Sequence, residues 1–422
     1  MEKNGQSYNQ TPGMVIFDVE GVLLPKRRYI LFQATRRLGF RQFFKIILFG
    51  ILYEISLIQL KTALRWIFGC FKGFTIHELY SYYQKMPLLP GVTEVFSHLH
   101  QKGWKTCLIS SGLPQLFVRE LAEKLKADCA FGVELETMNG RFTGRITGDV
   151  IEKDGKAKVL RNTLSHEQFN TQSLILVADD RNNLPLFPYV GLRIGYNPDF
   201  KLTLRSDYVV TGKLTEILPV ITGGKPGKSE PFLSRNDLLR SAIHMSGFAI
   251  PFISRYFLDH YMLIFLIGLV TMLYIISELA RILDRSFPVF TWITNKATVR
   301  LEPYEFATNP IFYALGITLS LMFFPSPIGY AAIATLTLGD GFASLLGKKY
   351  GRNSSPFNKT KSLEGSLFGL LFAFLGTSFF LTPAKALLAA ASGMLIESIP
   401  TPINDNLTIP LTVSIVLSIA AL

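Results

Sequence analysis

The sequence is poor in cysteine, with only three among 422 residues, namely Cys70, Cys107 and Cys129. Their small number and irregular spacing exclude a disulfide framework and a cysteine-built zinc site. We therefore expect the protein to work in a reducing compartment, and we assign no chemistry to these thiols.

Signals for secretion and for nucleic-acid binding are also missing. The first segment, MEKNGQSYNQTPG, lacks the apolar core of a signal peptide, so we expect the domain that follows to stay on the side where it is made. The sequence contains no aromatic-basic RNA motif and no zinc finger, although its formal net charge is +12. A membrane protein that faces anionic lipid explains this charge better than a nucleic-acid partner does.

Charged residues are scarce, at 18% of the chain, while apolar residues make up 49%. Up to about residue 235 the two kinds are mixed, as in a globular domain. From residue 242 onward, charges are confined to gaps between long apolar stretches. The segment 221–236 is rich in Gly, Pro, Ser and Lys, which is typical of a linker. We therefore predict a globular domain over 12–220, a linker over 221–236 and a membrane domain over 237–422.

The predicted membrane domain contains a series of apolar segments, which predict an all-α, polytopic fold with about seven transmembrane helices. These segments are 242–257, 261–279, 308–325, 328–346, 363–382, 384–399 and 407–422. Most Lys and Arg residues of this half fall in alternate connections. The positive-inside rule then places these connections and the N-terminal domain in the cytoplasm.

One polar segment, 338–365, interrupts this apolar half with the sequence LGDGFASLLGKKYGRNSSPFNKTKSLEG. Ionisable groups at the edge of a membrane bundle are costly, and glycines beside cations suit a phosphate, so we predict that an anion is handled here. The expected topology brings further polar residues to the same face. These additional candidates are His244, Glu278, Arg281, Glu397, Asp405 and Asn406.

The spacing of this segment resembles the CTP-binding signature of the dolichol kinase, phytol kinase and CTP-dependent diacylglycerol kinase family. The family's Lys-Lys-Thr is replaced by Thr360-Lys361-Ser362 here. The resemblance implies a nucleotide-binding site formed by Asp340, Gly347, Gly351, Lys361, Ser362, Glu364 and Gly365.

The same resemblance implies a phosphoryl donor, an acceptor and a metal. CTP is the donor, and the acceptor is a lipid alcohol, either an isoprenoid such as dolichol, phytol or geranylgeraniol, or diacylglycerol. Mg²⁺ is held by Asp340 or Glu364. Glu278, Glu397 and Asp405 remain unranked candidates for a metal ligand or a base.

The N-terminal half contains four motifs, and each adjoins a predicted strand or helix. Asp18 ends the apolar stretch MVIFD, Ser110 follows another in TCLIS, Lys156 opens a predicted helix in DGKAKVLR, and Asp179 ends the stretch LILVA. They resemble the motifs of haloacid dehalogenase phosphatases, in particular phosphoserine-phosphatase-like members. The resemblance implies an α/β, Rossmann-like domain with a helical cap at about 26–86. Because parallel strands end at one edge of a sheet, we expect these residues to meet.

The phosphatase resemblance also implies a role for each motif residue. Asp18 is the nucleophile that forms an aspartyl-phosphate, and Glu20, at a position where most members have Asp, is the acid and base on the leaving oxygen. Ser110 and Lys156 hold the phosphoryl group. Asp18 and Asp179 bind Mg²⁺. Asn183 replaces a second acidic residue, for which Asp180 can compensate.

Two further segments of this half have recognisable patterns. The stretch 42–60 is apolar, but a single membrane crossing there would separate Asp18 from Ser110. It is therefore either a buried cap helix or a basic amphipathic one lying on the membrane. The sequence FGVELETMNGRFTGRI predicts a β-hairpin with its turn at Asn139 and Gly140.

We therefore predict a bifunctional membrane enzyme, in which a CTP-dependent lipid kinase is joined to a Mg²⁺-dependent phosphomonoesterase. Its expected partners are a lipid alcohol, a phosphomonoester and the bilayer. Two alternatives remain open. One is a lipid kinase whose N-terminal domain is only a regulatory module, and the other is a CTP-dependent cytidylyltransferase.

Overall fold

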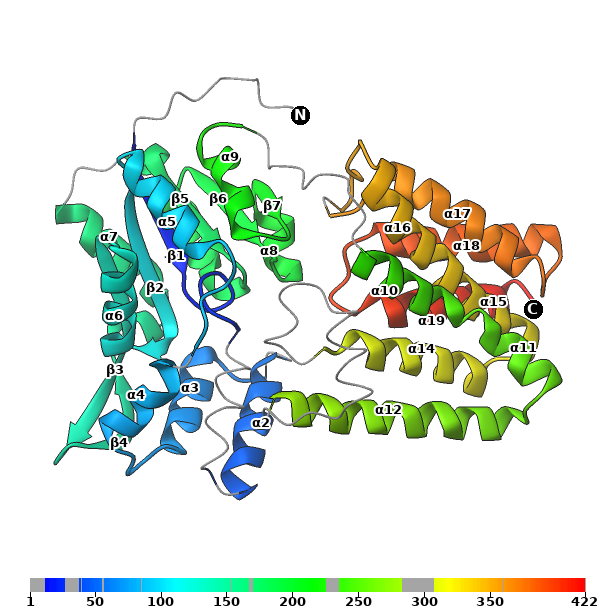
Figure 1. Ribbon diagram of the computed structural model, residues 1–422, viewed down its shortest axis with the longest axis horizontal. Coiled ribbons are helices and arrows are strands. Elements are labelled where there is room, and N and C mark those ends of the chain that lie inside the picture. Colours follow the sequence, from blue (N-terminus) through cyan, green and yellow to red (C-terminus); the bar gives the residue numbers. More distant parts are fainter. Residues whose placement is uncertain are drawn as a thin grey trace. The chain divides into compact units, whose positions relative to one another are not determined.

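The computed structural model describes residues 12–26, 38, 40–54, 57–84, 86–152, 154–166, 170–224, 235–282, 307–358 and 360–421. The chain divides into two compact units, Met1–Lys228 and Ser229–Leu422 (Figure 1). The division falls within the segment predicted to be a linker, of which residues 225–234 lie outside the described part.

A sheet forms the centre of the N-terminal unit. Its strands are β1 (Met14–Asp18), β2 (Lys105–Pro114), β3 (Cys129–Met138), β4 (Arg141–Thr147), β5 (Leu174–Ala178), β6 (Leu192–Tyr196) and β7 (Tyr208–Val210). The seven strands lie in the order β4-β3-β2-β1-β5-β6-β7, and every neighbouring pair is parallel except β3 and β4. Every residue of β1 and β5 is buried, which agrees with the continuous apolar sequences MVIF and LILVA, and Asp18 at the end of β1 is buried with them. The predicted Rossmann-like α/β fold is confirmed.

Helices flank this sheet (Figure 1). They are α5 (Val92–Gln101), α6 (Gln115–Leu125), α7 (Gly155–His166), α8 (Phe200–Arg205) and α9 (Leu218–Ile221). Within the sheet, β2 lies next to β1 on one side, and β5, which comes later in the chain, lies next to β1 on the other side. The carboxyl end of β1 is therefore a topological switch point, which is where ligand sites form in open α/β sheets.

Three helices follow β1 and occupy the expected cap region, namely α2 (Phe40–Glu54), α3 (Leu60–Gly69) and α4 (Ile76–Gln84). Helix α2 has 15 residues and ends at Glu54, so it is shorter than the predicted segment 42–60 and than the ~20 residues of a membrane span. Ile46 is buried, whereas Leu48 and Lys45 are exposed. The helix is therefore amphipathic, and its contact with a membrane stays a prediction.

The predicted β-hairpin is confirmed by β3 and β4. Asn139 and Gly140 have φ values of 51° and 72°, so both residues of the two-residue turn are left-handed, as a type I′ turn requires. The hairpin also holds the cap. The amide of Gly73 donates to the carbonyl of Phe142 at 2.8 Å, and the amide of Phe142 donates to the carbonyl of Phe74 at 2.8 Å.

The C-terminal unit is mainly helical in its described part. Its helices are α10 (Arg235–Ser246), α11 (Ala249–Tyr256), α12 (His260–Ile282), α14 (Asn309–Phe323), α15 (Ser326–Ala334), the π-helical turn η7 (Thr335–Asp340), α16 (Gly341–Tyr350), α17 (Leu363–Thr377), α18 (Pro383–Ser398) and α19 (Asp405–Ile419). Each of the predicted apolar segments lies on one or more of these helices, and the first is divided between α10 and α11.

Two stretches of this unit are long and apolar enough to cross a membrane, His260–Arg281 with 22 residues and Ser326–Tyr350 with 25 residues. Only 17% of the apolar window of the first is buried, so α12 presents large apolar side chains such as Phe265 and Met272 outward. The apolar helices Asn309–Phe323, Leu363–Thr377 and Asp405–Ile419 are shorter. Seven crossings therefore stay a prediction.

Candidate functional site

The first candidate site lies where β1, β2 and β5 end. Asp18 is the last residue of β1, Ser110 lies in β2, and Asp179 directly follows β5. All three side chains are buried, and the neighbouring residue Asp180 is partly buried. The carboxylates of Asp18, Asp179 and Asp180 offer oxygen atoms that all lie within 4.8 Å of one another.

Lys156 and Asn183 hold the Asp18 carboxylate in place. The ammonium of Lys156, in the first turn of α7, donates to Oδ1 of Asp18 at 3.0 Å and to Oδ1 of Asn183 at 2.8 Å. The Asn183 amide in turn donates to Oδ2 of Asp18 and, at 3.0 Å, to Oδ1 of Asp180. The backbone amide of Val19 adds a hydrogen bond of 3.0 Å to Oδ1 of Asp18. Donors therefore orient both oxygens of the expected nucleophile.

Glu20 and Ser110 form the neighbouring part of the site. The Ser110 hydroxyl donates to Oε2 of Glu20 at 2.7 Å. Its oxygen accepts hydrogen bonds from the amides of Gly112 and Leu113 at 3.2 and 2.9 Å. Both side chains are buried, so the hydroxyl is fixed beside the carboxylate that the sequence assigned to acid and base chemistry.

The electrostatics of this site favour a cation. Burial raises the pKa of Asp18 to about 6, against the opposing effect of Lys156. Burial also raises the pKa of Asp179 well above its ordinary value, although Lys26 lies 3.4 Å from its Oδ2. Crowded carboxylates of this kind are typical of a functional site, and oxygen ligands are those that Mg²⁺ prefers. The donor set of Asp18, Asp179 and Asp180 therefore fits Mg²⁺.

Gly21 belongs to the first motif of the sequence, whereas Tyr53 and Arg181 had no clear signal there. Gly21 has a φ of 82°, and a Cβ there would lie 2.0 Å from Oδ2 of Asp179, so the glycine lets the backbone pass close to the carboxylate. From the cap, Tyr53 of α2 donates its hydroxyl to Oδ1 of Asn182. The guanidinium of Arg181 donates to the Tyr53 carbonyl at 2.8 Å and lies 4.9 Å from the centroid of its ring. The cap is thereby joined to the 3₁₀ helix η4 (Arg181–Tyr189), which follows Asp180.

The second candidate site surrounds Lys361 in the C-terminal unit. The ammonium nitrogen of Lys361 lies 2.6 Å from Oε1 of Glu397, 3.1 Å from Oδ2 of Asp405 and 3.9 Å from Oδ1 of Asp340. Nε2 of His244 lies 3.4 Å from Oδ2 of Asp340. Residues from α10, η7, α18 and α19 therefore gather around one lysine, and we name these five residues the Lys361 cluster.

The charge balance of the Lys361 cluster is negative, and it keeps the lysine protonated. Burial disfavours the charged amine, but the nearby carboxylates of Glu397, Asp340 and Asp405 outweigh this effect and raise the pKa of Lys361. Asp340 is the last residue of the π-helical turn η7, and π turns within α-helices are frequent at functional sites. Within the described residues, only Asp18, Asp179 and Asp180 meet the closeness expected of metal ligands, so a metal on Asp340 stays a prediction.

The remaining kinase candidates lie in other contacts. The buried carboxylate of Glu278 accepts hydrogen bonds from the guanidinium of Arg281, at 3.0 and 2.8 Å, and from the amide of Ala307 at 3.1 Å. The side chain of Asn406 donates to the carbonyl of Asn309 at 3.3 Å, which joins α19 to α14. These contacts give Glu278 and Asn406 a role in holding the fold together.

Glu364 and Ser362 also have local partners. The carboxylate of the partly buried Glu364 accepts from the backbone amide of Asn353 at 3.2 Å and from the Asn353 side chain at 3.0 Å. The Ser362 oxygen accepts from the amide of Gly365 at 3.1 Å and so caps the N-terminus of α17. Phosphate or metal contacts of these residues stay predictions.

The glycines of the predicted nucleotide site allow two helices to approach closely. A Cβ on Gly365 would lie 2.9 Å from Cα of Gly347 and 2.8 Å from the carbonyl oxygen of Ala343. A Cβ on Gly351 would lie 2.6 Å from the Ser362 oxygen. Small residues at such crossings let backbones pack directly. Packing of α16 against α17 therefore accounts for these glycines, and their binding of phosphate stays a prediction.

Comparisons with known proteins separate the two halves in the same way. Residues 15–187 match the family model described as haloacid dehalogenase-like hydrolase. The phosphoserine phosphatase of Archaeoglobus fulgidus is 28% identical over 192 residues, which are 45% of this chain and 54% of that protein. The probable phytol kinase 3, chloroplastic, of Glycine max is 35% identical over 145 residues, which are 30% of this chain and 46% of that protein. The chain thus spans about half the length of these relatives.

A solved structure, the phospho-aspartyl intermediate analogue of a phosphoserine phosphatase, has 22% identity and a TM-score of 0.45. The aligned part is 50% of this chain and 100% of the chain in that structure. The family and sequence matches bear out both predicted resemblances. The N-terminal half resembles haloacid dehalogenase phosphatases of the phosphoserine-phosphatase type, and the C-terminal half resembles phytol kinases.

Proposed function

We propose that this chain, which joins a haloacid dehalogenase-like half to a phytol-kinase-like half, is a bifunctional membrane enzyme. The C-terminal unit transfers the γ-phosphoryl group of CTP to a lipid alcohol, and the N-terminal unit hydrolyses a phosphomonoester. The observation that carries the proposal is a buried or partly buried lysine among carboxylates in each unit, Lys156 beside Asp18 and Lys361 beside Glu397.

In the phosphatase unit, a carboxylate oxygen of Asp18 attacks the phosphorus of the monoester. The phosphorus–oxygen bond to the alcohol breaks, and the leaving oxygen takes a proton from Glu20. A water molecule then gives a proton to Glu20 while the water oxygen attacks the phosphorus of the aspartyl-phosphate. The bond between phosphorus and the Asp18 oxygen breaks, which releases inorganic phosphate and the free Asp18 carboxylate. Lys156 and Ser110 hold the phosphoryl oxygens, and their hydrogen bonds to Asp18 and Glu20 support these roles.

Mg²⁺ fits the same unit, with Asp18, Asp179 and Asp180 as its protein ligands. When bound there it supplies positive charge beside the phosphoryl oxygens. Phosphoserine is one candidate substrate, because several relatives of this half are named phosphoserine phosphatases.

In the kinase unit, the hydroxyl oxygen of the lipid attacks the γ-phosphorus of CTP, and the bond between that phosphorus and the β-phosphate oxygen breaks. CDP leaves, and a carboxylate of the Lys361 cluster accepts the hydroxyl proton. The ammonium of Lys361 stabilises the negative charge of the phosphates. The likeness to phytol kinases supports an isoprenoid alcohol as the acceptor.

The test uses detergent-solubilised full-length protein, CTP labelled in its γ-phosphate, and a panel of phytol, dolichol, geranylgeraniol and diacylglycerol. The wild type is compared with Asp340→Asn and Asp18→Asn. We expect Asp340→Asn alone to abolish transfer of label to lipid, and Asp18→Asn alone to abolish release of phosphate from monoesters.

Three other results would contradict parts of the proposal. Loss of both activities in Asp18→Asn would mean that the two sites do not work separately. A wild type that transfers label but hydrolyses no monoester would leave the N-terminal unit a regulatory module. Incorporation of label from α-labelled CTP, without incorporation from γ-labelled CTP, would identify a cytidylyltransferase.

A further inference from the structure

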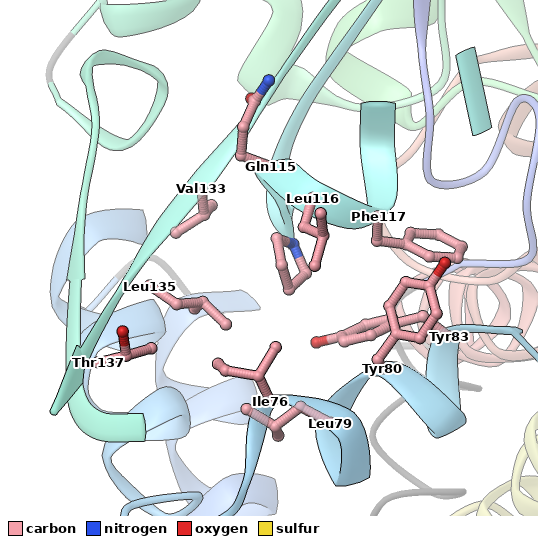
Figure 2. Close-up of a pocket in the computed structure, with 11 residues that line it drawn as sticks. Ile76, Leu79, Tyr80, Tyr83, Gln115, Leu116, Phe117, Val133, Leu135 and Thr137 are labelled. Carbon is pink, nitrogen blue, oxygen red and sulfur yellow. The ribbon is translucent and has the colours of Figure 1, made fainter. Parts of the chain in front are cut away.

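An apolar cavity of about 210 Å³ lies between the cap and the sheet of the N-terminal unit. Its walls come from α4, from the end of β2 with the start of α6, and from β3. Figure 2 shows Leu135 of β3 on one side of this space, and Tyr83 of α4 beside Phe117 of α6 on the other. An apolar space of this size within a cap can hold part of a ligand.

The cavity lies beside the phosphatase site. The amide of Leu113 donates to the Ser110 oxygen at 2.9 Å, and the next residue, Pro114, already lines the cavity. From α4, the ring of Tyr83 packs against Phe117 with centroids 5.1 Å apart. Burial, together with the negative charge of nearby Glu20, raises the pKa of the Tyr83 hydroxyl. Tyr83 thus lines the cavity and lies near Glu20, the residue expected to protonate the leaving group.

The chemistry of the lining does not suit a charged leaving group. The residues that line the cavity are described, and none of them is an acid or a base. The amide of Gln115 is already used, because its nitrogen donates to the carbonyl of Ala130 at 2.9 Å and its oxygen accepts from the amide of Gly132. The lining offers the ammonium and carboxylate of a phosphoserine only the neutral hydroxyls of Tyr80, Tyr83 and Thr137. Both charged groups would therefore lose hydration here without gaining a partner of opposite charge, which is unfavourable.

We propose that this cavity receives the apolar leaving group of the phosphatase substrate, which is therefore a phosphomonoester of an apolar alcohol. The proposal rests on the phosphatase activity proposed above and names its substrate class. An apolar cavity of 150 Å³ can hold benzene. A cavity of about 210 Å³ thus holds one ring or a short branched segment, and a longer chain extends through its open side.

The test compares substrates that differ only in their leaving group. Phosphate release by the full-length protein is measured with octyl phosphate, ethyl phosphate and phosphoserine, and the quantity compared is the ratio of kcat/KM values. We expect octyl phosphate to exceed each of the other two about tenfold or more, because a single methylene in an apolar pocket is already worth about tenfold.

A matched pair of variants tests whether the cavity causes the preference for octyl phosphate. Leu135→Glu places a carboxylate in the cavity, whereas Met138→Glu makes the same kind of change on the same strand at a side chain that is 69% exposed and outside the lining. We expect the octyl-to-ethyl ratio to fall about tenfold in Leu135→Glu and to stay at the wild-type value in Met138→Glu. Leu116→Glu, on a lining residue that is 58% exposed, serves if Leu135→Glu does not fold.

The outcomes separate this proposal from the one on which it rests. If the wild type hydrolyses ethyl phosphate or phosphoserine as well as octyl phosphate, the cavity does not select the leaving group and the phosphatase still stands. An unchanged ratio in folded Leu135→Glu and Leu116→Glu would overturn the cavity's role in the same way. If none of the three esters is hydrolysed, the phosphatase and the substrate class are both wrong.

Discussion

At the scale of single residues, Asn183 determines how the phosphatase site is held together. Its amide connects Asp18, Lys156 and Asp180, which come from three different parts of the chain. The position is one where an acidic residue is usual in the resembled family. A neutral amide can donate to Asp18 and accept from Lys156 at the same time, which a carboxylate cannot do.

Replacing Asn183 with Ala should therefore lower phosphate release. The change removes hydrogen bonds to a carboxylate and to an ammonium, each worth about 1.5–3 kcal/mol, so we expect kcat to fall at least tenfold. The measurement is release of phosphate from a monoester. Asn170→Ala, at an exposed helix cap, is the control. Wild-type kcat in Asn183→Ala would show that the network does not support the nucleophile.

Lys361 has the corresponding place in the C-terminal unit, and Lys361→Met should affect both activity and stability. The substitution leaves Glu397, which is 2% exposed, close to two other carboxylates without their cation. Breaking a buried pair in this way costs about 3–5 kcal/mol, so we expect a lower Tm and loss of transfer from CTP to lipid.

The control for this lysine is Lys348→Met. Lys348 pairs with Asp237 at 2.6 Å, but its side chain is 45% exposed, and exposed pairs contribute about 1 kcal/mol or less. Thermal unfolding in detergent and label transfer are the two measurements. Equal effects of the two substitutions would contradict a special role for the Lys361 cluster.

At the scale of elements, the crossing of α16 and α17 depends on glycine. Gly365→Ala places a methyl group 2.8 Å from the carbonyl oxygen of Ala343, so the helices must separate. Overpacking of this kind costs about 1–3 kcal/mol. Because Lys361 and Ser362 directly precede α17, we expect label transfer to fall as well, while phosphate release in the other unit is unchanged.

Gly268→Ala is the matched control for this crossing. Gly268 lies in α12, and a Cβ there meets no atom within 4 Å. Alanine at that position should be tolerated, since it also favours the helix by up to about 1 kcal/mol. Thermal unfolding and label transfer compare the two variants. If Gly365→Ala matched Gly268→Ala in both, α16 and α17 would not need their close contact.

At the scale of the whole molecule, the C-terminal unit exposes an apolar surface along one of its helices. Helix α12 carries outward-facing apolar side chains such as Tyr261, Phe265 and Met272, with exposed fractions of 79%, 68% and 61%. Such a continuous apolar surface is unfavourable in water but is suited to lipid.

We therefore expect the protein to remain in the membrane fraction after extraction with alkaline carbonate, and to enter solution only with detergent. Immunoblotting of the two fractions is the measurement. A parallel extraction with high salt is the control, because salt releases proteins held only by charge. Release of the full-length protein by carbonate alone would contradict an integral membrane unit.

The sequence predicted the type of most elements and was less accurate about where they end. The apolar run MVIFD and the Asn-Gly pair at 139–140 are strong local signals, and both gave the expected strand and turn. In contrast, the predicted apolar helix 42–60 ends at Glu54, and the predicted segment 242–257 is divided at Gly247. A Cβ on Gly247 would lie 1.9 Å from the Tyr313 hydroxyl, a contact that hydropathy cannot reveal.

By itself the sequence determined the order of the motifs, because strand composition, turn residues and helix periodicity are properties of neighbouring positions. The resemblance of these motifs to those of haloacid dehalogenase phosphatases implied the Rossmann-like sheet, and the long apolar stretches predicted the helical C-terminal half. Only the tertiary structure decided which candidate side chains meet. Asn183 reaches Asp18 across 165 positions and Lys361 reaches Glu397 across 36, whereas Glu364 turns to Asn353. Such pairs depend on the packing of distant elements, and the apolar cavity of the cap depends on it for the same reason.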